Sequence, residues 1–455
     1  MQLTTEFKKI ISELKKQIKV FFEFPENRAL FWISVLVLVF FVSLNWMAWG
    51  GALFNTDNDK PIPGLEENKV FLDDQNKGIA FIPGHLPEVL GDRVVESEEE
   101  KNTENESDIK SLPEVTNSAD FSDAEVGPAI WVNKYDYKNQ GDLEKVFVNA
   151  KKAGFKTVFF QARDKADAYY RSLYEPWAQE LSGKLGKNPG WDPLSVAVVQ
   201  SKKHKLKLHA WVNVYTVWKG EKKPSLGSHL YNKHEDWLMH EKDKGQMKLN
   251  PGYTYISPGN PNATNYLYKV MMDIASRYDV DGIHFDKFHY PTAYHSYDPV
   301  SLDRFRRQYQ LSWDEWRVAQ LDRFLVKVQK GLDQRGLKTK VSSLVYGRYE
   351  EGKRDFGQDS VAWVKEKTVD FICPLIPYSS KDYPRFDLQV EEFKARVDDK
   401  RLCIGIGAYK FGSDFEELTK QVKIIKQQNL KNFSFYTYRH IKSRLGGIKG
   451  LINTF

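Results

Sequence analysis

One short stretch of the chain combines a strand pattern with side chains that could do acid–base chemistry. Residues 278–291 read YDVDGIHFDKFHYP, and a mostly apolar run from Gly282 leads into the carboxylate of Asp286. Strand side chains alternate between two faces, so His284 and Asp286 share one face and Phe285 takes the other. A strand that ends on an inward acid among aromatics is typical of active sites in (β/α)₈ barrels. The alternative is a buried strand whose Asp286 only caps the following helix.

The rest of the chain supplies the elements that such a barrel needs. From residue 129 onward, runs rich in β-branched and aromatic residues alternate with helical segments such as 141–153 and 193–205. The eight predicted strands are Ala129–Asn133, Thr157–Gln161, Lys207–Asn213, Gly282–Asp286, Lys340–Val345, Asp370–Pro374, Leu402–Gly407 and Asn432–Thr437. This alternation predicts an α/β fold with a parallel sheet closed into a (β/α)₈ TIM barrel. An open doubly wound sheet is the rival, but no glycine-rich phosphate loop follows the first strand.

The ends of the predicted strands give the side chains expected at the carboxyl rim of the barrel. Aromatic side chains are frequent there, and rings that carry a polar edge suit the C–H faces of sugars. Some of these aromatics are expected to fill the top layer of the barrel instead. The residues that we single out as substrate contacts are Arg163, Asp167, Trp211, Asn213, Tyr215, His284, Tyr290, Tyr378 and Tyr436.

Four motifs occur in the order seen in a known family. They are residues 166–177 (ADAYYRSLYEPW), 181–194 (LSGKLGKNPGWDPL), 208–213 (LHAWVN) and 278–286, the last followed by Tyr290 and Pro291. On these motifs the chain resembles the bacterial glycosyl-hydrolase-like family 10, over roughly residues 129–440. The resemblance implies a cell-envelope (β/α)₈ protein associated with cleavage of peptidoglycan glycan strands.

Two positions depart from the pattern of that family. The family usually has a second acid after the residue that matches Asp286, where this chain has Lys287. On the sixth strand the family tends to have a glutamine where this chain has Leu375. Either change could weaken activity, although both leave Asp286 in place. A catalytically degenerate barrel that binds glycan or acts as a scaffold in the envelope is therefore the alternative function.

Glycoside hydrolysis requires two carboxyl groups, one ionised and one protonated. We expect Asp286 to be the nucleophile or base. The acid is open between Glu350, just beyond the fifth strand, and Asp382, beyond the sixth. Arg163 and His284 are expected to hydrogen-bond Asp286 or the sugar, and for His284 a barrel-filling role is the alternative.

The sequence favours neither a metal site nor a disulfide scaffold. His284, Asp286 and His289 are of metal-ligand type, but no second cluster at ligand spacing accompanies them, so we expect no metal and no cofactor. Cys373 and Cys403 are the two cysteines, and each lies in a predicted strand. We therefore expect both to be buried thiols.

The N-terminal part of the chain predicts a membrane anchor and a tether. Residues 29–49 carry no charge and are long enough to cross a bilayer of roughly 30 Å as a helix. Bases precede this run and acids follow it, which places the N-terminus in the cytoplasm and the barrel in the periplasm or outside the cell. A cleavable signal peptide is the rival, but the leading region is long for one. The predicted parts are a cytoplasmic tail (1–28), a transmembrane anchor (29–54), an acidic, largely disordered linker (55–127) and the barrel (128–455).

Charge is divided unevenly along the chain. Between Asp92 and Glu125 there are twelve acids and three bases, whereas from Val126 to the end 55 Lys and Arg exceed 38 Asp and Glu, a net of +17. Such a field favours an anionic partner, and the predicted topology and the lack of a nucleic-acid motif argue against nucleic acid. The sequence thus predicts a membrane-anchored glycoside hydrolase of the cell envelope that acts on a polysaccharide, with peptidoglycan glycan strands as the expected substrate.

Overall fold

A computed structural model describes residues 126–308, 310–381, 383–411 and 414–454 of the chain. The predicted tail, the predicted membrane anchor and nearly all of the predicted linker lie outside these residues. No helix in the part of the chain that is described is long and apolar enough to cross a membrane.

Eight parallel strands form a closed barrel in the described residues, in the order β1-β12-β11-β10-β9-β8-β3-β2. Their bounds are β1 Pro128–Val132, β2 Thr157–Arg163, β3 Lys207–Asn213, β8 Gly282–Asp286, β9 Lys340–Tyr346, β10 Phe371–Ile376, β11 Ile404–Ile406 and β12 Phe433–Phe435. Each predicted strand overlaps one of these, with ends that differ by at most two residues. The (β/α)₈ barrel predicted from the sequence is therefore confirmed.

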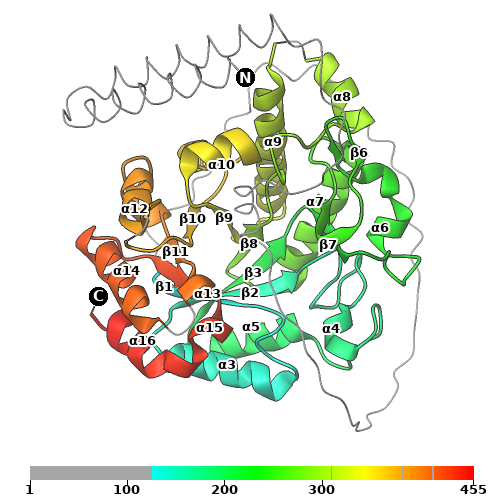
Figure 1. The fold of residues 1–455 in the computed structure, drawn as a ribbon. Helices are drawn as coiled ribbons and strands as arrows, with labels where there is room; N and C mark the ends of the chain where they lie inside the picture. Colours follow the sequence, from blue (N-terminus) through cyan, green and yellow to red (C-terminus); the bar gives the residue numbers. More distant parts are fainter. Residues whose placement is uncertain (1–125, 309, 382, 412–413, 455) are drawn as a thin grey trace, which may run out of the picture. The chain divides into compact units, whose positions relative to one another are not determined.

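Helices surround the barrel (Figure 1). They include α3 Gln140–Lys152, α5 Pro193–His204, α7 Pro261–Arg277, α9 Trp313–Gln334, α12 Phe386–Lys394, α14 Phe415–Gln427 and α16 Leu445–Ile452. Local sequence explains their starts: Asp192 caps α5 with Pro193 in its first turn, and Ser312 and Glu315 form a capping box on α9. The other α-helices of the described residues have four to eight residues and are α4 Gln179–Ser182, α6 Leu230–Lys233, α8 Pro299–Arg306, α10 Tyr349–Phe356, α11 Ser360–Lys365, α13 Ala408–Phe411 and α15 Tyr438–Ile441.

Both faces of the barrel strands are buried, so the core has two parts. Side chains such as Ile130 and Phe160 point outward and pack with the helices in one large apolar cluster. Trp131, Phe159 and His284 alternate with them and fill the interior, where the Phe159 ring stacks on the His284 ring at 4.2 Å. Burial on both faces is the reason that these strands read as nearly continuous apolar runs.

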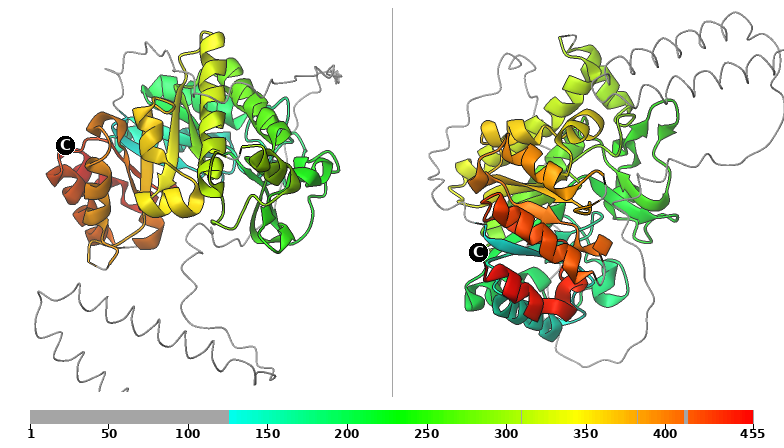
Figure 2. Two further views of the ribbon diagram at one scale, coloured as in Figure 1. Left: turned by 90° about the horizontal axis from the view of Figure 1, so that it is seen from above. Right: turned by 60° about the vertical axis from the view of Figure 1, so that its left-hand side comes forward.

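The two longest connections follow β3 and β8. The first contains the antiparallel hairpin of β4 (Thr216–Gly220) and β7 (Asn250–Tyr255), and a smaller pair, β5 (His240–Glu241) and β6 (Gly245–Gln246). The second contains α8. In the views of Figure 2 these additions, drawn in green, project from one side of the barrel. They bring residues remote from the strands to its carboxyl rim.

Candidate active site at the carboxyl rim

Asp286 is the last residue of β8, and its register partner on β3 is Asn213. Both side chains are buried, with 2% of each residue exposed. The chain turns sharply after the strand because Lys287 adopts a left-handed φ of 50°, and the Lys287 N–H donates to Asp286 Oδ1 at 2.6 Å. Trp211, two residues before Asn213, donates its indole N–H to Asn213 Oδ1 at 3.0 Å. The predicted residues Asp286, Asn213 and Trp211 therefore lie together.

The surroundings of Asp286 favour its protonated form. Burial raises the pKa of its carboxyl group, and the negative charge of Asp164 acts in the same direction. The ammonium and N–H of Lys287 and a hydrogen bond from Trp211 oppose this shift, but the pKa remains above its ordinary value. Asp286 therefore has the environment of a proton donor, whereas the sequence led us to expect the ionised partner.

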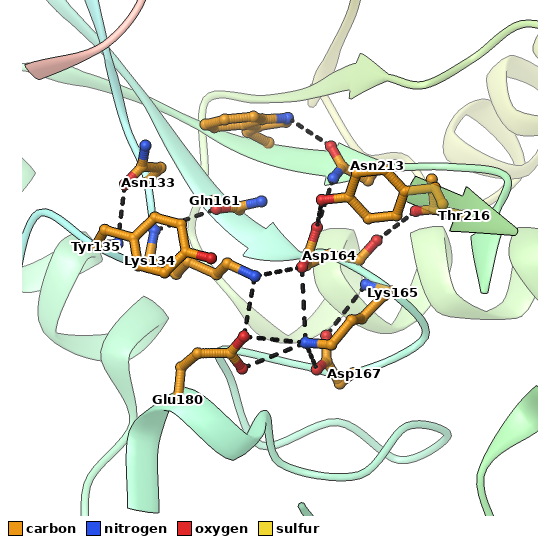
Figure 3. Close-up of polar contacts among 12 residues, drawn as sticks. Asn133, Lys134, Tyr135, Gln161, Asp164, Lys165, Asp167, Glu180, Asn213 and Thr216 are labelled. Atoms are coloured by element: carbon orange, nitrogen blue, oxygen red, sulfur yellow. Dashed lines mark hydrogen bonds and ion pairs between the residues drawn. The ribbon is translucent and has the colours of Figure 1, made fainter. Parts of the chain in front are cut away.

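Asp164 is a carboxylate that the sequence places at the rim, at the end of the second strand, but to which we gave no role there. It directly follows β2, and its Oδ1 accepts hydrogen bonds from Asn213 Nδ2 at 2.8 Å and Tyr253 Oη at 2.7 Å. Its Oδ2 accepts one from Lys134 Nζ at 2.6 Å. Figure 3 shows Lys134 and Asn213 reaching Asp164 from opposite sides. Asn213 thus lies beside both Asp164 and Asp286.

Two lysines and three acids form a buried lysine–carboxylate cluster at the ends of β1 and β2. Lys165 Nζ lies 2.8 Å from Asp167 Oδ2 and 3.1 Å from Glu180 Oε1, and Lys134 Nζ lies 3.0 Å from Glu180 (Figure 3). Burial alone would raise the pKa of Asp164, but the charges of Lys134 and Lys165 outweigh it and hold that pKa well below its usual range. Asp164 is therefore ionised. The predicted substrate contact Asp167 is a member of this cluster.

Their different surroundings thus shift the pKa values of the Asp164 and Asp286 carboxyl groups in opposite directions. They are close enough for the charge of Asp164 to act on Asp286, and Asn213 lies between them. Paired acids whose pKa values are pushed apart are the pattern of general acid–base catalysis.

An aromatic cluster adjoins Trp211, which hydrogen-bonds Asp286. The ring of Tyr436, which follows β12, is 5.6 Å from Trp211, 5.4 Å from Trp131 and 6.0 Å from Tyr409. Rings of this kind pack well on the C–H faces of sugars. The structure therefore brings the predicted contacts Trp211 and Tyr436 together.

His284 lies inside the barrel. Its Nδ1 is 2.9 Å from Ser342 Oγ, and its ring stacks on Phe159. Burial lowers the pKa of His284 well below its ordinary value, so the imidazole is neutral. This position agrees with the barrel-filling alternative.

The guanidinium of Arg163 is fully buried and paired with Glu175 at 2.8 Å. It also donates to the carbonyl oxygens of Val214 at 3.0 Å and Thr216 at 3.1 Å. Arg163 therefore fixes the chain that follows β3, a role different from the predicted contact with Asp286 or sugar.

Tyr215 and Tyr290 are core residues in this structure. The Tyr215 ring stacks on Phe288 at 5.5 Å, and the side chain is completely buried. Tyr290 donates its hydroxyl to the Arg317 carbonyl oxygen at 3.0 Å, and the Arg317 guanidinium lies 4.3 Å from its ring. Both follow strand ends, but the chain has left the strand there, so period-2 alternation no longer tells where their side chains point.

The two acids predicted as partners of Asp286 have different outcomes. Glu350 has a side chain that is 68% exposed and lies 3.2 Å from Arg396, whereas Asp382 lies outside the described residues. The neighbouring Glu351 contacts the end of β9, because it accepts a hydrogen bond from Tyr346 Oη at 2.9 Å. The predicted contact Tyr378 also hydrogen-bonds Tyr346.

The described residues contain no group of three or more His, Cys, Asp or Glu side chains arranged to hold a metal ion. Cys373 and Cys403 are buried free thiols, as predicted.

Two solved glycoside hydrolases have a similar fold. The glycoside hydrolase domain of PgaB (BpsB) from Bordetella bronchiseptica superposes with a TM-score of 0.56 at 15% identity, over 72% of this chain and 99% of that domain. The catalytic domain of β-amylase from Paenibacillus polymyxa gives 0.50 at 11% identity, over 72% and 98%. At these identities the likeness shows the fold alone. By fold and site, the molecule is a (β/α)₈-barrel protein with a buried carboxylate pair at its carboxyl rim.

Its sequence defines the family more closely. The chain belongs to the family described as Glycosyl hydrolase-like 10, which it matches over residues 129–421. It is 24% identical to the glycosyl hydrolase YngK of Bacillus subtilis, over 68% of this chain and 65% of that protein. It is 27% identical to the glycosyl hydrolase DigH of Escherichia coli, over 57% and 63%. The matches thus span slightly less than two thirds of either relative.

Proposed function

We propose that this protein is a glycoside hydrolase in which Asp286 is the general acid and Asp164 is its ionised partner. The observation that carries the proposal is the pair itself: two carboxyl groups beside one asparagine, one with its pKa raised by burial and the other held ionised by lysines. Glycoside hydrolysis passes through a transition state with oxocarbenium character and uses one carboxyl group in each state.

Each residue of the site has a role in this reaction. Asp286 gives its proton to the glycosidic oxygen as the bond to the anomeric carbon breaks, and a water molecule then adds to that carbon and returns a proton to Asp286. The negative charge of Asp164 stabilises the positive charge that develops on the sugar ring, and Lys134 keeps Asp164 ionised. Asn213 holds the carboxyl of Asp164 in place through its hydrogen bond of 2.8 Å. Trp211 and Tyr436 offer rings on which the sugar can lie.

The proposed substrate is a cell-wall glycan, and the proposed location is the outer side of the cytoplasmic membrane. The net charge of +17 from Val126 onward supports an anionic polymer. The uncharged run 29–49, with bases before it, supports a single-pass anchor whose N-terminus is cytoplasmic. The family match and the glycosyl hydrolases among the relatives support action on a polysaccharide. Within that class we propose peptidoglycan glycan strands.

A glycan-binding or scaffolding barrel is the second candidate function. It is favoured by Lys287, which stands where the family usually has an acid. It is also favoured by the engagement of both Asp164 oxygens by Asn213, Tyr253 and Lys134. Such a protein would bind glycan strands through the aromatic rings of the rim without cleaving them.

The two functions separate in one experiment on the full chain in detergent micelles. Purified glycan strands are incubated with the protein, and new reducing ends are measured by mass spectrometry. We expect release by the wild type and a loss of about 10²–10⁴-fold in Asp286→Asn and in Asp164→Asn.

Asp322→Asn is the matched control. Burial also raises the pKa of Asp322, to about 7, but this carboxyl accepts a hydrogen bond from Trp363 on α11 and lies on α9, outside the barrel. This variant should cleave like the wild type. Glycan binding without release by the wild type would support the scaffold instead.

A further inference from the structure

A cavity with a basic lining lies at the end of the barrel opposite the carboxylate pair. It has a volume of about 590 Å³ and opens at the amino-terminal ends of the strands, and its walls include the first residues of β3, β9 and β10. Part of its lining is apolar, from side chains such as Val280, Leu337 and Phe371. The charged part has four bases and two acids, namely Lys207, Arg277, Lys338, Lys340, Asp279 and Asp281.

The bases act on the interior of the cavity. Lys207 and Lys340 are the first residues of β3 and β9, the two strands that pair with β8. The charges of both lysines act on His209, a buried residue in the cavity wall. Burial and these two charges lower the pKa of His209 to about 3, so the imidazole adds no charge of its own. The cavity therefore combines an apolar floor with a positive wall, which suits a segment that carries acids and an aromatic ring.

The chain itself enters at this cavity. Val126 lines its wall and is only 4% exposed. Its carbonyl oxygen accepts a hydrogen bond from Thr157 Oγ1 at 2.6 Å, and the following N–H, of Gly127, donates to Asn432 Oδ1 at 2.9 Å. The residues immediately before Val126 must therefore start at the cavity wall, since consecutive residues advance by about 3.5 Å at most.

Those preceding residues have the matching composition. Residues 111–125 read SLPEVTNSADFSDAE, with four acids, no base and one aromatic, Phe121. Because the segment is joined to the cavity wall, its local concentration there is on the order of millimolar or higher, and even a weak attraction would hold it. We infer that residues 111–125 dock in the cavity at the amino-terminal end of the barrel, with their acids toward Lys207, Lys338 and Lys340 and Phe121 on the apolar floor.

Docking can be tested by disulfide crosslinking in the full chain in detergent micelles. One pair joins Ser122→Cys to Thr339→Cys, in the cavity wall. The control pair joins Ser122→Cys to Lys431→Cys, which precedes Asn432 and so lies near Val126 but outside the cavity. The two native cysteines are buried, and a count of reactive thiols before oxidation checks both that and the fold.

A docked segment should give a crosslinking rate roughly tenfold higher for the cavity pair than for the control pair. In about 1 M salt, where the screening length falls to about 3 Å, the ratio should approach one. Lys338→Glu should lower the ratio as well, because Lys338 is an exposed base of the cavity wall. Equal rates for the two pairs, or a ratio that neither salt nor Lys338→Glu changes, would overturn the inference. Because the readout is a crosslinking rate, the result does not depend on whether the protein cleaves glycan.

Discussion

At the scale of single residues, Asp286 should make the folded protein less stable as the pH rises. The pKa of Asp286 is higher in the folded protein than in the unfolded chain, where it is about 4. The folded protein therefore loses stability as the pH rises from about 4 through the folded pKa. Asp286→Asn removes this penalty. We expect the variant to melt a few degrees higher than the wild type at pH 7 and no higher near pH 4, measured by thermal unfolding. A lower melting temperature at both pH values would show that Asp286 is a structural residue.

Lys134 should set the acidic limb of the pH dependence of activity. The proposed mechanism needs Asp164 ionised, so activity should be lost as the pH falls through the pKa of Asp164, which Lys134 and Lys165 hold low against burial. Lys134→Met should therefore move the acidic limb of the kcat/KM profile to higher pH and leave the basic limb, set by Asp286, in place. The same variant leaves Asp164 with less compensation and should cost about 3–5 kcal/mol of unfolding free energy.

A second lysine, Lys223, provides a control that tests whether these effects are specific to Lys134. Lys223 pairs with Glu235 at the surface, and its side chain is 55% exposed. Lys223→Met should change neither the acidic limb nor, beyond about 1 kcal/mol, the stability. A shift of the acidic limb in this variant as large as in Lys134→Met would argue against a specific role of Lys134.

At the scale of elements, the position of β8 depends on a glycine. A Cβ added to Gly282 would lie 2.3 Å from Nδ1 of His209, and His209 is its register partner on β3. Gly282→Ala should therefore displace the strand that carries Asp286 and destabilise the protein by about 1–3 kcal/mol in denaturant unfolding. Gly450, in α16, has open space around it, so Gly450→Ala should be neutral or stabilise by up to about 1 kcal/mol. Equal effects would contradict the contact with His209.

The elements were predictable from the sequence because each barrel strand is a short buried run bounded by turn residues. The site was predictable where it lies on those strands: Asp286, Asn213 and Trp211 share the inward face that alternation gives them. Beyond the strand end, alternation no longer predicts the direction of a side chain. Tyr215 and Tyr290 lie beyond the ends of their strands, and both are buried in the core and not at the rim.

Two residues of the site, Tyr253 and Lys134, come from connections between the barrel strands, where the alternation of those strands does not apply. Tyr253 comes from the second strand of the β4–β7 hairpin, far along the connection after β3. Lys134 lies two residues beyond the end of β1, where strand alternation no longer tells which way a side chain points. The sequence does place Asp164 immediately after β2 and next to Lys165. In the structure both Lys165 and Lys134 pair with it.

At the scale of the whole molecule, the predicted anchor leads to a test of location. If residues 29–49 form an uncleaved transmembrane helix, the full-length protein of 52.9 kDa should remain with membranes after a high-salt wash and be released by detergent. A salt wash removes proteins held only by charge, which the basic barrel could otherwise mimic. A shorter, freely soluble mature form would instead indicate cleavage near the end of the apolar run.

The ring of strands also sets the time at which the protein becomes complete during its biosynthesis. β1 pairs with β12, and Gly127 hydrogen-bonds Asn432, a residue 305 positions later. Until β12 has been made, β1 and β11 would both be open edges that can pair with other chains. Tyr436, on which the aromatic side of the site depends, also arrives only with this last strand. In the proposed topology the barrel is translocated before it closes, so glycan cleavage would begin only after export, and a chain truncated before β12 would tend to aggregate there.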